Sequence, residues 1–249
     1  MATINQNKCT GCQRCLIFCP AEAISYKDGK CVVDQAVCTE CYVCLRHTIC
    51  PNEAFDPTEL NTYIKQFQHV ISDAAEAHGI KKGTTGRGGK EVKTQDVTGR
   101  IKQGQVGITI DMGRPGLGVY LRDVEKVAMA LIKAGVEMPP AEKSPLGSLM
   151  QDYTTGKLNP EFLNYHFHTL LMEGICTTEQ LPSVLKALQE VENKIETVFA
   201  VGLVMHVDKN CYNSALDCLD ELGIPKPHRG KVNVGLGRPL ASETRNGRE

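Results

Sequence analysis

The sequence predicts an α+β protein built from two unlike modules, and two observations support this. The first 51 residues hold a repeated cysteine motif that ends each time in Cys-Pro. From residue 105 onward, stretches with strand periodicity alternate with stretches of helix periodicity. A helix pattern and a basic, glycine-rich segment lie between these regions. We therefore expect three parts: residues 1–57, 58–104 and 105–249.

Both copies of the cysteine motif begin with the same spacing. They consist of Cys9, Cys12, Cys15 and Cys19, and of Cys38, Cys41, Cys44 and Cys50. A C-x2-C-x2-C run with a more distant Cys-Pro is the pattern that supplies thiolates to cubane iron–sulfur clusters. Zinc suits the pattern less well, because structural zinc sites use two spaced pairs of ligands. A disulfide framework also suits it less well, since such frameworks are typical of short secreted chains.

The repeat continues after the cysteines, because the sequence of Pro20–Ile24 is similar to that of Pro51–Phe55. On these residues the first part resembles a bacterial-type two-[4Fe-4S] ferredoxin, a small pseudo-twofold α+β domain that carries single electrons at low potential. In such ferredoxins the fourth cysteine of each motif binds the other cluster. The resemblance thus implies Cys9, Cys12, Cys15 and Cys50 for cluster one, and Cys38, Cys41, Cys44 and Cys19 for cluster two.

One departure from the family concerns the second motif, where five residues separate Cys44 from Cys50 instead of three. We expect this to change the local geometry and the relative potentials of the clusters but not their ligation. Residues 1–60 hold five Lys/Arg and seven Asp/Glu, and an acidic shell disfavours adding an electron to an anionic cluster. The composition therefore favours low potentials.

The overall composition excludes several classes of function. The net charge of −1 over 249 residues argues against bulk attraction to nucleic acid. The longest apolar run, Val198–Met205, is too short to span a membrane. Residues 1–20 lack the basic start and apolar stretch of a secretion signal. We expect a cytoplasmic protein in an anaerobic setting, because oxygen attacks exposed clusters.

The middle part begins with a predicted helix from Leu60 to His78, which ends at Gly79. Residues 81–102 then hold seven basic and two acidic residues among several glycines. An extended, solvated linker is one interpretation of this basic segment. The other is a docking segment for an acidic partner or a clamp for a phosphate group, with Arg87, Lys90, Lys93 and Arg100 as the contact residues.

The third part follows the order β-α-β-β-α-β, which predicts a split βαβ sandwich, a ferredoxin-like fold of the ACT type. Here "ferredoxin-like" names a fold and implies no cluster. The expected elements are strand 106–112, helix 121–134, strand 146–150, strand 165–172, helix 178–195 and strand 197–207. A short helix over 213–222 and an edge strand over 232–234 follow. This part resembles no named family.

A glycine-rich corner joins the first of these strands to its helix. It can cradle an anion through Gly113, Arg114, Gly116 and Gly118, although tight structural turns are the commoner use of such a sequence. A second Gly-Arg-Pro occurs at 237–239.

Three histidines are further candidate metal ligands. His166, His168 and His206 can form a metal site, but no carboxylate or open-site motif accompanies them, so ordinary buried or exposed histidines are the favoured interpretation. Four cysteines outside the motifs are predicted to be small buried hydrophobes: Cys31, Cys176, Cys211 and Cys218. We find no nucleophile elbow or paired-carboxylate motif, so catalytic residues are not assigned.

Together these features predict an iron–sulfur electron-transfer protein with two [4Fe-4S] clusters. We expect a non-catalytic subunit or dedicated carrier of a larger anaerobic oxidoreductase, because a free carrier needs only residues 1–57. The expected partners are a redox protein and, through the C-terminal part, a second copy of the chain. The alternative is a redox- or ligand-sensing regulator in which the ACT-like part binds a small effector.

Overall fold

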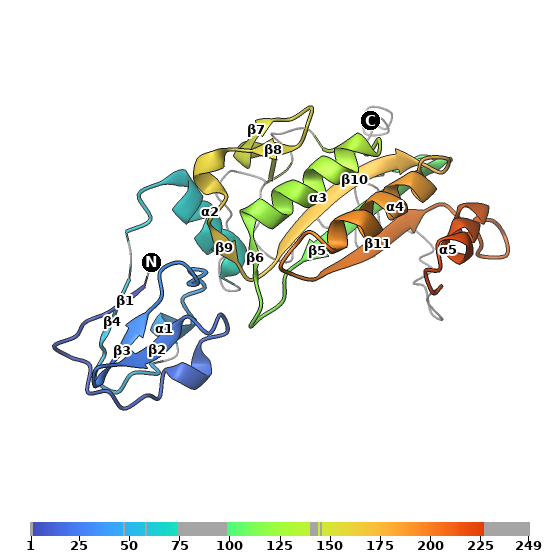
Figure 1. Cartoon of the computed structure of the whole chain (residues 1–249). Coiled ribbons are helices and arrows are strands. Elements are labelled where there is room, and N and C mark those ends of the chain that lie inside the picture. Colours follow the sequence, from blue (N-terminus) through green and yellow to red (C-terminus); the bar gives the residue numbers. More distant parts are fainter. Residues whose placement is uncertain are drawn as a thin grey trace, which may run out of the picture.

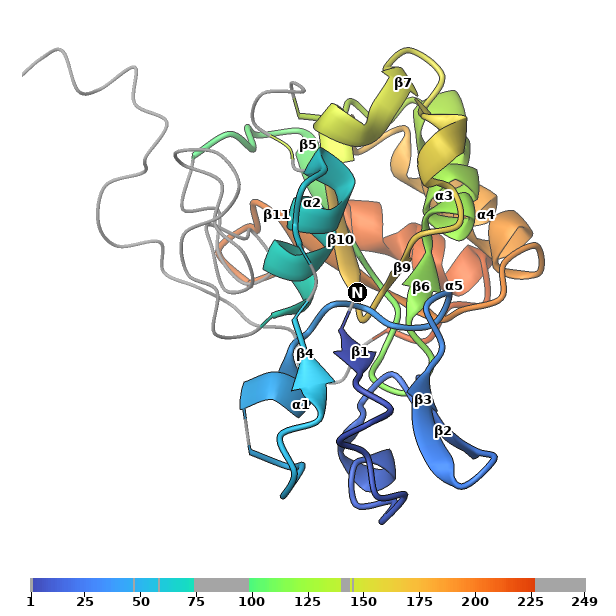
Figure 2. The ribbon, with the colours of Figure 1, turned by 90° about the vertical axis from the view of Figure 1, so that its left-hand side faces the viewer.

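The computed structural model describes residues 2–46, 48–57, 59–73, 99–139, 144 and 146–226. Within these ranges the chain forms a small N-terminal module and a larger C-terminal module (Figure 1). Helix α2 (Tyr63–Ser72) follows the small module and lies against the large one. Figure 2 shows the N-terminal module below the sheet and helices of the C-terminal module.

The N-terminal module consists of two small antiparallel sheets. β1 (Thr3–Ile4) pairs with β4 (Phe55–Asp56), and β2 (Ile24–Lys27) pairs with β3 (Lys30–Val33). A 3₁₀ helix (Leu16–Phe18) follows Cys15, and α1 (Val43–Arg46) contains Cys44. One cluster of buried side chains consists of Cys9, Cys15, Ile24, Cys31, Ile49 and Ala54. This core is small, so it contributes little stability by itself.

Helix α2 begins at its N-cap Thr62, whose hydroxyl accepts a hydrogen bond from the backbone N–H of Lys65 at 3.4 Å. Its side chains Ile64 and Phe67 are buried, and both residues belong to the core of the C-terminal module. The ring of Phe67 packs edge-on against Phe167, with 5.6 Å between centroids. The helix predicted over residues 60–78 is shorter in the structure, since it begins at Tyr63 and ends at Ser72, and Asp73 is extended with a φ of −87° and a ψ of 111°.

The C-terminal module is centred on a three-stranded sheet. β5 (Gln105–Met112) lies between β10 (Leu170–Thr177) and β11 (Phe199–Met205), and both neighbours run antiparallel to it. Alternate β5 side chains, from Val106 to Met112, point to one face and are fully buried. This alternation is why the sequence predicts a strand here.

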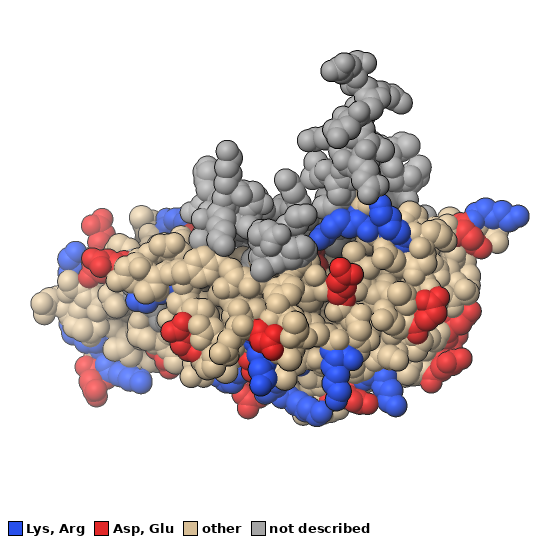
Figure 3. All heavy atoms as spheres, turned by 90° about the horizontal axis from the view of Figure 1, so that it is seen from above, with Lys and Arg blue, Asp and Glu red and all other residues tan. Residues whose placement is uncertain are grey.

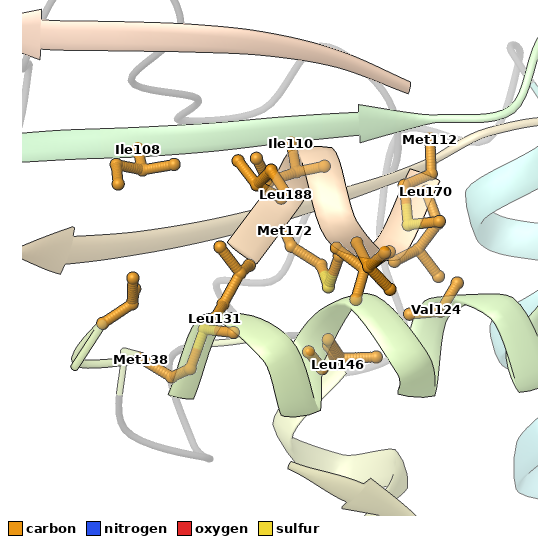
Figure 4. Close-up of a cluster of buried hydrophobic side chains, with 14 of the residues drawn as sticks. Ile108, Ile110, Met112, Val124, Leu131, Met138, Leu146, Leu170, Met172 and Leu188 are labelled. Carbon is orange, nitrogen blue, oxygen red and sulfur yellow. The ribbon is translucent and has the colours of Figure 1, made fainter. Parts of the chain in front are cut away.

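Helices α3 (Leu121–Lys133) and α4 (Leu181–Glu192) cover that apolar face of the sheet (Figure 1). Figure 4 shows Val124 and Leu131 of α3 directed towards Ile110 and Met172 of the sheet. The predicted strand 106–112 and helix 121–134 are therefore confirmed to within one residue. The predicted helix 178–195 and strand 197–207 are also present, as the shorter elements α4 and β11.

Smaller elements surround this core. β6 (Val119–Tyr120) pairs with β9 (His166–Phe167), and β7 (Met150–Asp152) pairs with β8 (Lys157–Leu158). A 3₁₀ helix (Pro160–Phe162) precedes β9. The short helix predicted over 213–222 is present as a 3₁₀ turn (Ser214–Asp217) followed by α5 (Cys218–Glu221). The edge strand predicted at 232–234 lies outside the described residues.

Two strand predictions in the C-terminal module are wrong. Leu146–Leu149 forms a 3₁₀ helix, since Gly147 and Ser148 are poor strand formers. The predicted strand 165–172 is divided into β9 and β10, because His168 leaves the ladder and contacts the N-terminal module. In the described residues, Glu137 forms a single bridge to Ile175 at the outer edge of β10, where a split βαβ fold has its fourth strand.

Candidate iron–sulfur centre

The first three cysteines of motif one line a cavity together with Cys50 of motif two. The remaining lining residues are Ile4, Thr10, Gln13, Arg14, Cys31, Asn52, Ala54 and Phe55. The loop between Cys9 and Cys12 bends at Gly11, which has a φ of +69°. A Cβ atom at Gly11 would lie 2.1 Å from the carbonyl oxygen of Gly29, so only glycine fits this turn.

Backbone N–H groups point at the sulfur atoms around this cavity. The N–H groups of Gly11 and Cys31 lie 3.4 and 3.5 Å from Cys9 Sγ, and that of Ala54 lies 3.4 Å from Cys50 Sγ. Burial opposes ionisation of Cys9, but these N–H donors and nearby Lys30 outweigh it and lower the pKa of the thiol. The loop thus favours the thiolate form, which is the form that binds iron.

The second group of cysteines, Cys19, Cys38, Cys41 and Cys44, is half-buried. Burial raises the pKa of Cys44 to about 12, and the neighbouring Cys41, Cys38 and Cys19 add to the increase. Burial likewise raises the pKa of Cys38 to about 11, with Cys41 and Cys19 again contributing. Cys19 of motif one therefore lies close to the three-cysteine run of motif two. Its sulfur accepts a hydrogen bond from the backbone N–H of Ala23 at 3.3 Å.

Among the described residues, no three His, Cys, Asp or Glu side chains converge as ligands of one ion. The four cysteines around one cavity supply the number and type of ligands that a [4Fe-4S] cluster needs. Such a cluster, when bound, stores one electron at a time.

The loop of motif two is held against the C-terminal module by hydrogen bonds that the sequence did not indicate. Gln68 Nε2 donates to the carbonyl oxygen of Cys38 at 3.1 Å. His69 Nδ1 lies 2.9 Å from the carbonyl oxygen of Glu40, and His168 Nε2 lies 3.1 Å from Thr39 Oγ1. Burial raises the pKa of the Cys41 thiol. A hydrogen bond from the Thr39 hydroxyl to this thiol reduces the increase.

A fourth contact of the same kind joins His166 to the segment before Cys38. Its Nδ1 lies 2.7 Å from the carbonyl oxygen of Val37, and its Nε2 lies 3.2 Å from that of Leu117. His166 and His168 are buried, whereas His206 is exposed and lies 3.1 Å from the carbonyl oxygen of Ile101. The three histidines proposed as a metal set thus contact backbone or hydroxyl oxygens of separate segments.

The glycine-rich corner contacts the N-terminal module. The N–H of Gly116 donates to the carbonyl oxygen of Pro20 at 2.6 Å. Arg114 Nη1 donates to the carbonyl oxygen of Gly113 at 2.6 Å and lies 3.8 Å from Asp111 Oδ2. These contacts give the corner a structural use, and anion binding by Gly113, Arg114, Gly116 and Gly118 stays a prediction.

Most of the basic segment lies outside the described residues, including Arg87, Lys90 and Lys93. Of the residues assigned to it as contacts, the structure describes Arg100, whose guanidinium lies 3.4 Å from Glu173 Oε2. The second Gly-Arg-Pro at 237–239 is also outside the described residues.

The scattered cysteines follow the prediction in three of four cases. Cys31, Cys176 and Cys218 are buried, but Cys211 is exposed, so its prediction as a buried hydrophobe is wrong. Cys211 has a positive φ of 60° and its N–H donates to the carbonyl oxygen of Asp208, which places it in a surface turn.

Comparison with known proteins identifies the N-terminal module. Residues 2–25 match the family model of a 4Fe-4S binding domain. The chain is 51% identical over 41 residues to an uncharacterized ferredoxin-like protein of Haemophilus influenzae, covering 16% of this chain and 48% of that protein. It is also 46% identical over 37 residues to a ferredoxin-like protein in the nif region of Rhizobium leguminosarum bv. trifolii. This match covers 15% of this chain and 58% of that protein. The chain spans about half the length of these curated relatives.

These matches show a ferredoxin-type domain that binds a 4Fe-4S cluster at the N-terminus. The C-terminal module lies outside all of them, and no solved structure matches the chain. Among the described residues, no helix has the length and apolar character needed to cross a membrane.

Proposed function

We propose that this chain is an iron–sulfur electron-transfer protein that holds two [4Fe-4S] clusters. The observation that carries the proposal is the position of Cys50, which lines one cavity with Cys9, Cys12 and Cys15 although it belongs to motif two. Cys19, from motif one, correspondingly lies close enough to Cys38, Cys41 and Cys44 to alter their pKa values. Both placements support the crossed ligand sets that the resemblance implies.

The wider role that we propose is that of a dedicated carrier or non-catalytic subunit of a larger anaerobic oxidoreductase in the cytoplasm. The C-terminal module supports this role because His166 and His168 contact the loop of motif two, together with Gln68 and His69 of α2. We assign this module to the ferredoxin-like, ACT-type sandwiches. The strand order β10-β5-β11, with α3 and α4 on one face, supports the assignment.

Iron and sulfide analysis tests the cluster content. Protein purified without oxygen should contain about eight iron atoms and about eight acid-labile sulfides per chain, from two four-iron clusters. About four iron atoms would leave one cluster, and stoichiometric zinc in place of iron would contradict the proposal.

Substitution of the fourth cysteines tests the crossed ligation. Cys50→Ser should damage the cluster held by motif one, and Cys19→Ser the cluster held by motif two. Electron paramagnetic resonance of the reduced protein, compared with a Cys12→Ser and a Cys41→Ser reference, identifies which cluster is lost. The exposed Cys211 provides the control, since Cys211→Ser should leave both signals unchanged. Loss of the cluster in the same motif as the substituted cysteine would contradict crossed ligation.

The regulator hypothesis makes a different prediction. A carrier should co-purify with an oxidoreductase that it reduces or oxidises. A regulator should instead gain thermal stability from a small ligand bound to the C-terminal module, in the absence of a redox partner.

A further inference from the structure

The two cysteine motifs differ in exposure although their sequences are related. At equivalent positions of the repeat, Thr10 is exposed and Thr39 is 1% exposed. Gln13 of motif one is exposed, whereas its counterpart Tyr42 is half-buried and packs against the ring of His69 at 4.3 Å. Helix α2 and the segment around β9 therefore cover the loop of motif two. In motif one, Cys9 and Cys15 are buried, but Thr10 and Cys12–Arg14 between them are exposed.

The exposed side of motif one carries large apolar side chains. Ile17 is 84% exposed and Phe18 is 47% exposed, and both lie in the 3₁₀ helix directly after Cys15. Figure 2 shows this helix at the bottom of the view, on the side of the N-terminal module away from the large sheet. Exposed apolar groups rimmed by polar residues mark protein interaction sites. We name this surface, made of Cys12, Gln13, Arg14, Ile17 and Phe18, the cluster-one face.

Two cations, Arg14 and Lys30, lie beside the cluster-one face, although residues 1–60 as a whole hold more acidic than basic residues. Arg14 lines the cavity of Cys9, Cys12, Cys15 and Cys50, and no carboxylate lines it. Lys30 Nζ donates to the carbonyl oxygen of Cys9. The wider surface of the protein, by contrast, has both charges interspersed on the side that Figure 3 shows. A partner that carries carboxylates around an apolar centre is therefore complementary to this face.

We propose that the cluster-one face is the surface at which this protein exchanges electrons with its partner, and that the partner is an acidic one-electron redox protein. One electron passes between the cluster bound at this face and an oxidised or reduced flavin or iron–sulfur centre, and no bond forms or breaks. Cluster two communicates with the partner through cluster one, because α2 and the C-terminal module cover its loop. This inference rests on the proposed two-cluster function.

The first test measures the exposure of each cluster. A soluble gadolinium chelate added to the reduced holoprotein should shorten the spin relaxation of the cluster-one signal and leave that of cluster two nearly unchanged. The signals are assigned with the Cys12→Ser and Cys41→Ser variants. Equal effects on both signals would overturn the inference.

The second test measures electron transfer to two defined acceptors, an acidic flavodoxin and basic cytochrome c, by stopped flow across a salt series. Arg14→Gln and Phe18→Ser should each slow reduction of flavodoxin by about tenfold at low salt, because both the charge and the apolar contact guide docking. Val198, 48% exposed, and Lys186, exposed on α4, lie on the C-terminal module and provide controls. Val198→Ser and Lys186→Gln should change the rate less than twofold, roughly.

Three results would overturn the inference. The rates of Arg14→Gln and Phe18→Ser could match those of the controls while both cluster potentials stay unchanged. Cytochrome c could be preferred over flavodoxin at low salt. Light scattering could show a dimer that Phe18→Ser dissociates, which would make the occupant a second copy of the chain. A protein without iron would refute the proposed function as well, whereas two intact clusters with insensitive rates would refute the docking surface alone.

Discussion

Gln68 provides the sharpest test of how the two modules are joined. Its side chain is fully buried on α2, and its Nε2 donates to the carbonyl oxygens of Cys38 at 3.1 Å and His166 at 2.7 Å. One amide group thereby links the loop of motif two, α2 and β9. Gln68→Leu keeps the approximate volume of the side chain and removes both donors.

The expected cost follows from these contacts. Each carbonyl oxygen left buried without its donor costs about 1–3 kcal/mol, so two cost about 2–6 kcal/mol. Gln68 Oε1 has no hydrogen-bond partner in the part of the chain that the structure describes, and removing this oxygen returns roughly 1–2 kcal/mol. The net loss is therefore about 0–5 kcal/mol, with a midpoint of about 2.5 kcal/mol, which lowers the Tm of a chain of this size by about 5–10 °C.

The assay follows anaerobic thermal unfolding by the visible absorbance of the clusters and by far-ultraviolet circular dichroism. Gln66, exposed on the same helix, provides a matched control, since Gln66→Leu should change the stability by no more than about 0.5 kcal/mol. If Gln68→Leu and Gln66→Leu unfold at the same temperature and retain their clusters equally, the amide does not join the modules as argued.

Two further predictions use matched pairs of residues. Thr39→Val removes a hydrogen bond to sulfur and should lower the potential of cluster two in a redox titration, whereas Thr10→Val, at the exposed equivalent position, should change neither potential. Gly118 and Gly223 share a φ of +66°, but a Cβ at Gly118 would lie 2.1 Å from His166 Nε2, while nothing lies within 4 Å of one at Gly223. In thermal unfolding, Gly223→Ala should therefore cost about 1–2 kcal/mol and Gly118→Ala distinctly more.

The elements that the sequence predicted well are those with a local, periodic signal. The alternation of Val106–Met112 and the helical stripe of Leu121–Lys133 depend on neighbouring residues, and both elements are present. The division of 165–172 could not be predicted in this way. His166 and His168 alternate as they would in one strand, but their partners Val37 and Thr39 lie 129 positions away.

The cover over motif two was hidden from the sequence for the same reason. Gln68 and His69 lie within an amphipathic helix pattern and contact main-chain carbonyl oxygens of Cys38 and Glu40. Any residue can offer a carbonyl oxygen, so such a contact leaves no pattern in the partner segment. The cysteine spacing, in contrast, indicates the bound group from the sequence alone, because three thiolates at three-residue steps suit few groups other than an iron–sulfur cluster.

The longer spacing between Cys44 and Cys50 has a structural consequence in this interface. Its first two residues, Leu45 and Arg46, are the last residues of α1, and the Arg46 guanidinium pairs with the buried carboxylate of Asp73 directly after α2. His69 Nε2 lies 3.6 Å from the same carboxylate. A buried carboxylate is tolerated only with such partners, so Asp73 depends on a cation from the N-terminal module. The departure from the ferredoxin spacing thus falls beside an ion pair that fastens motif two to α2.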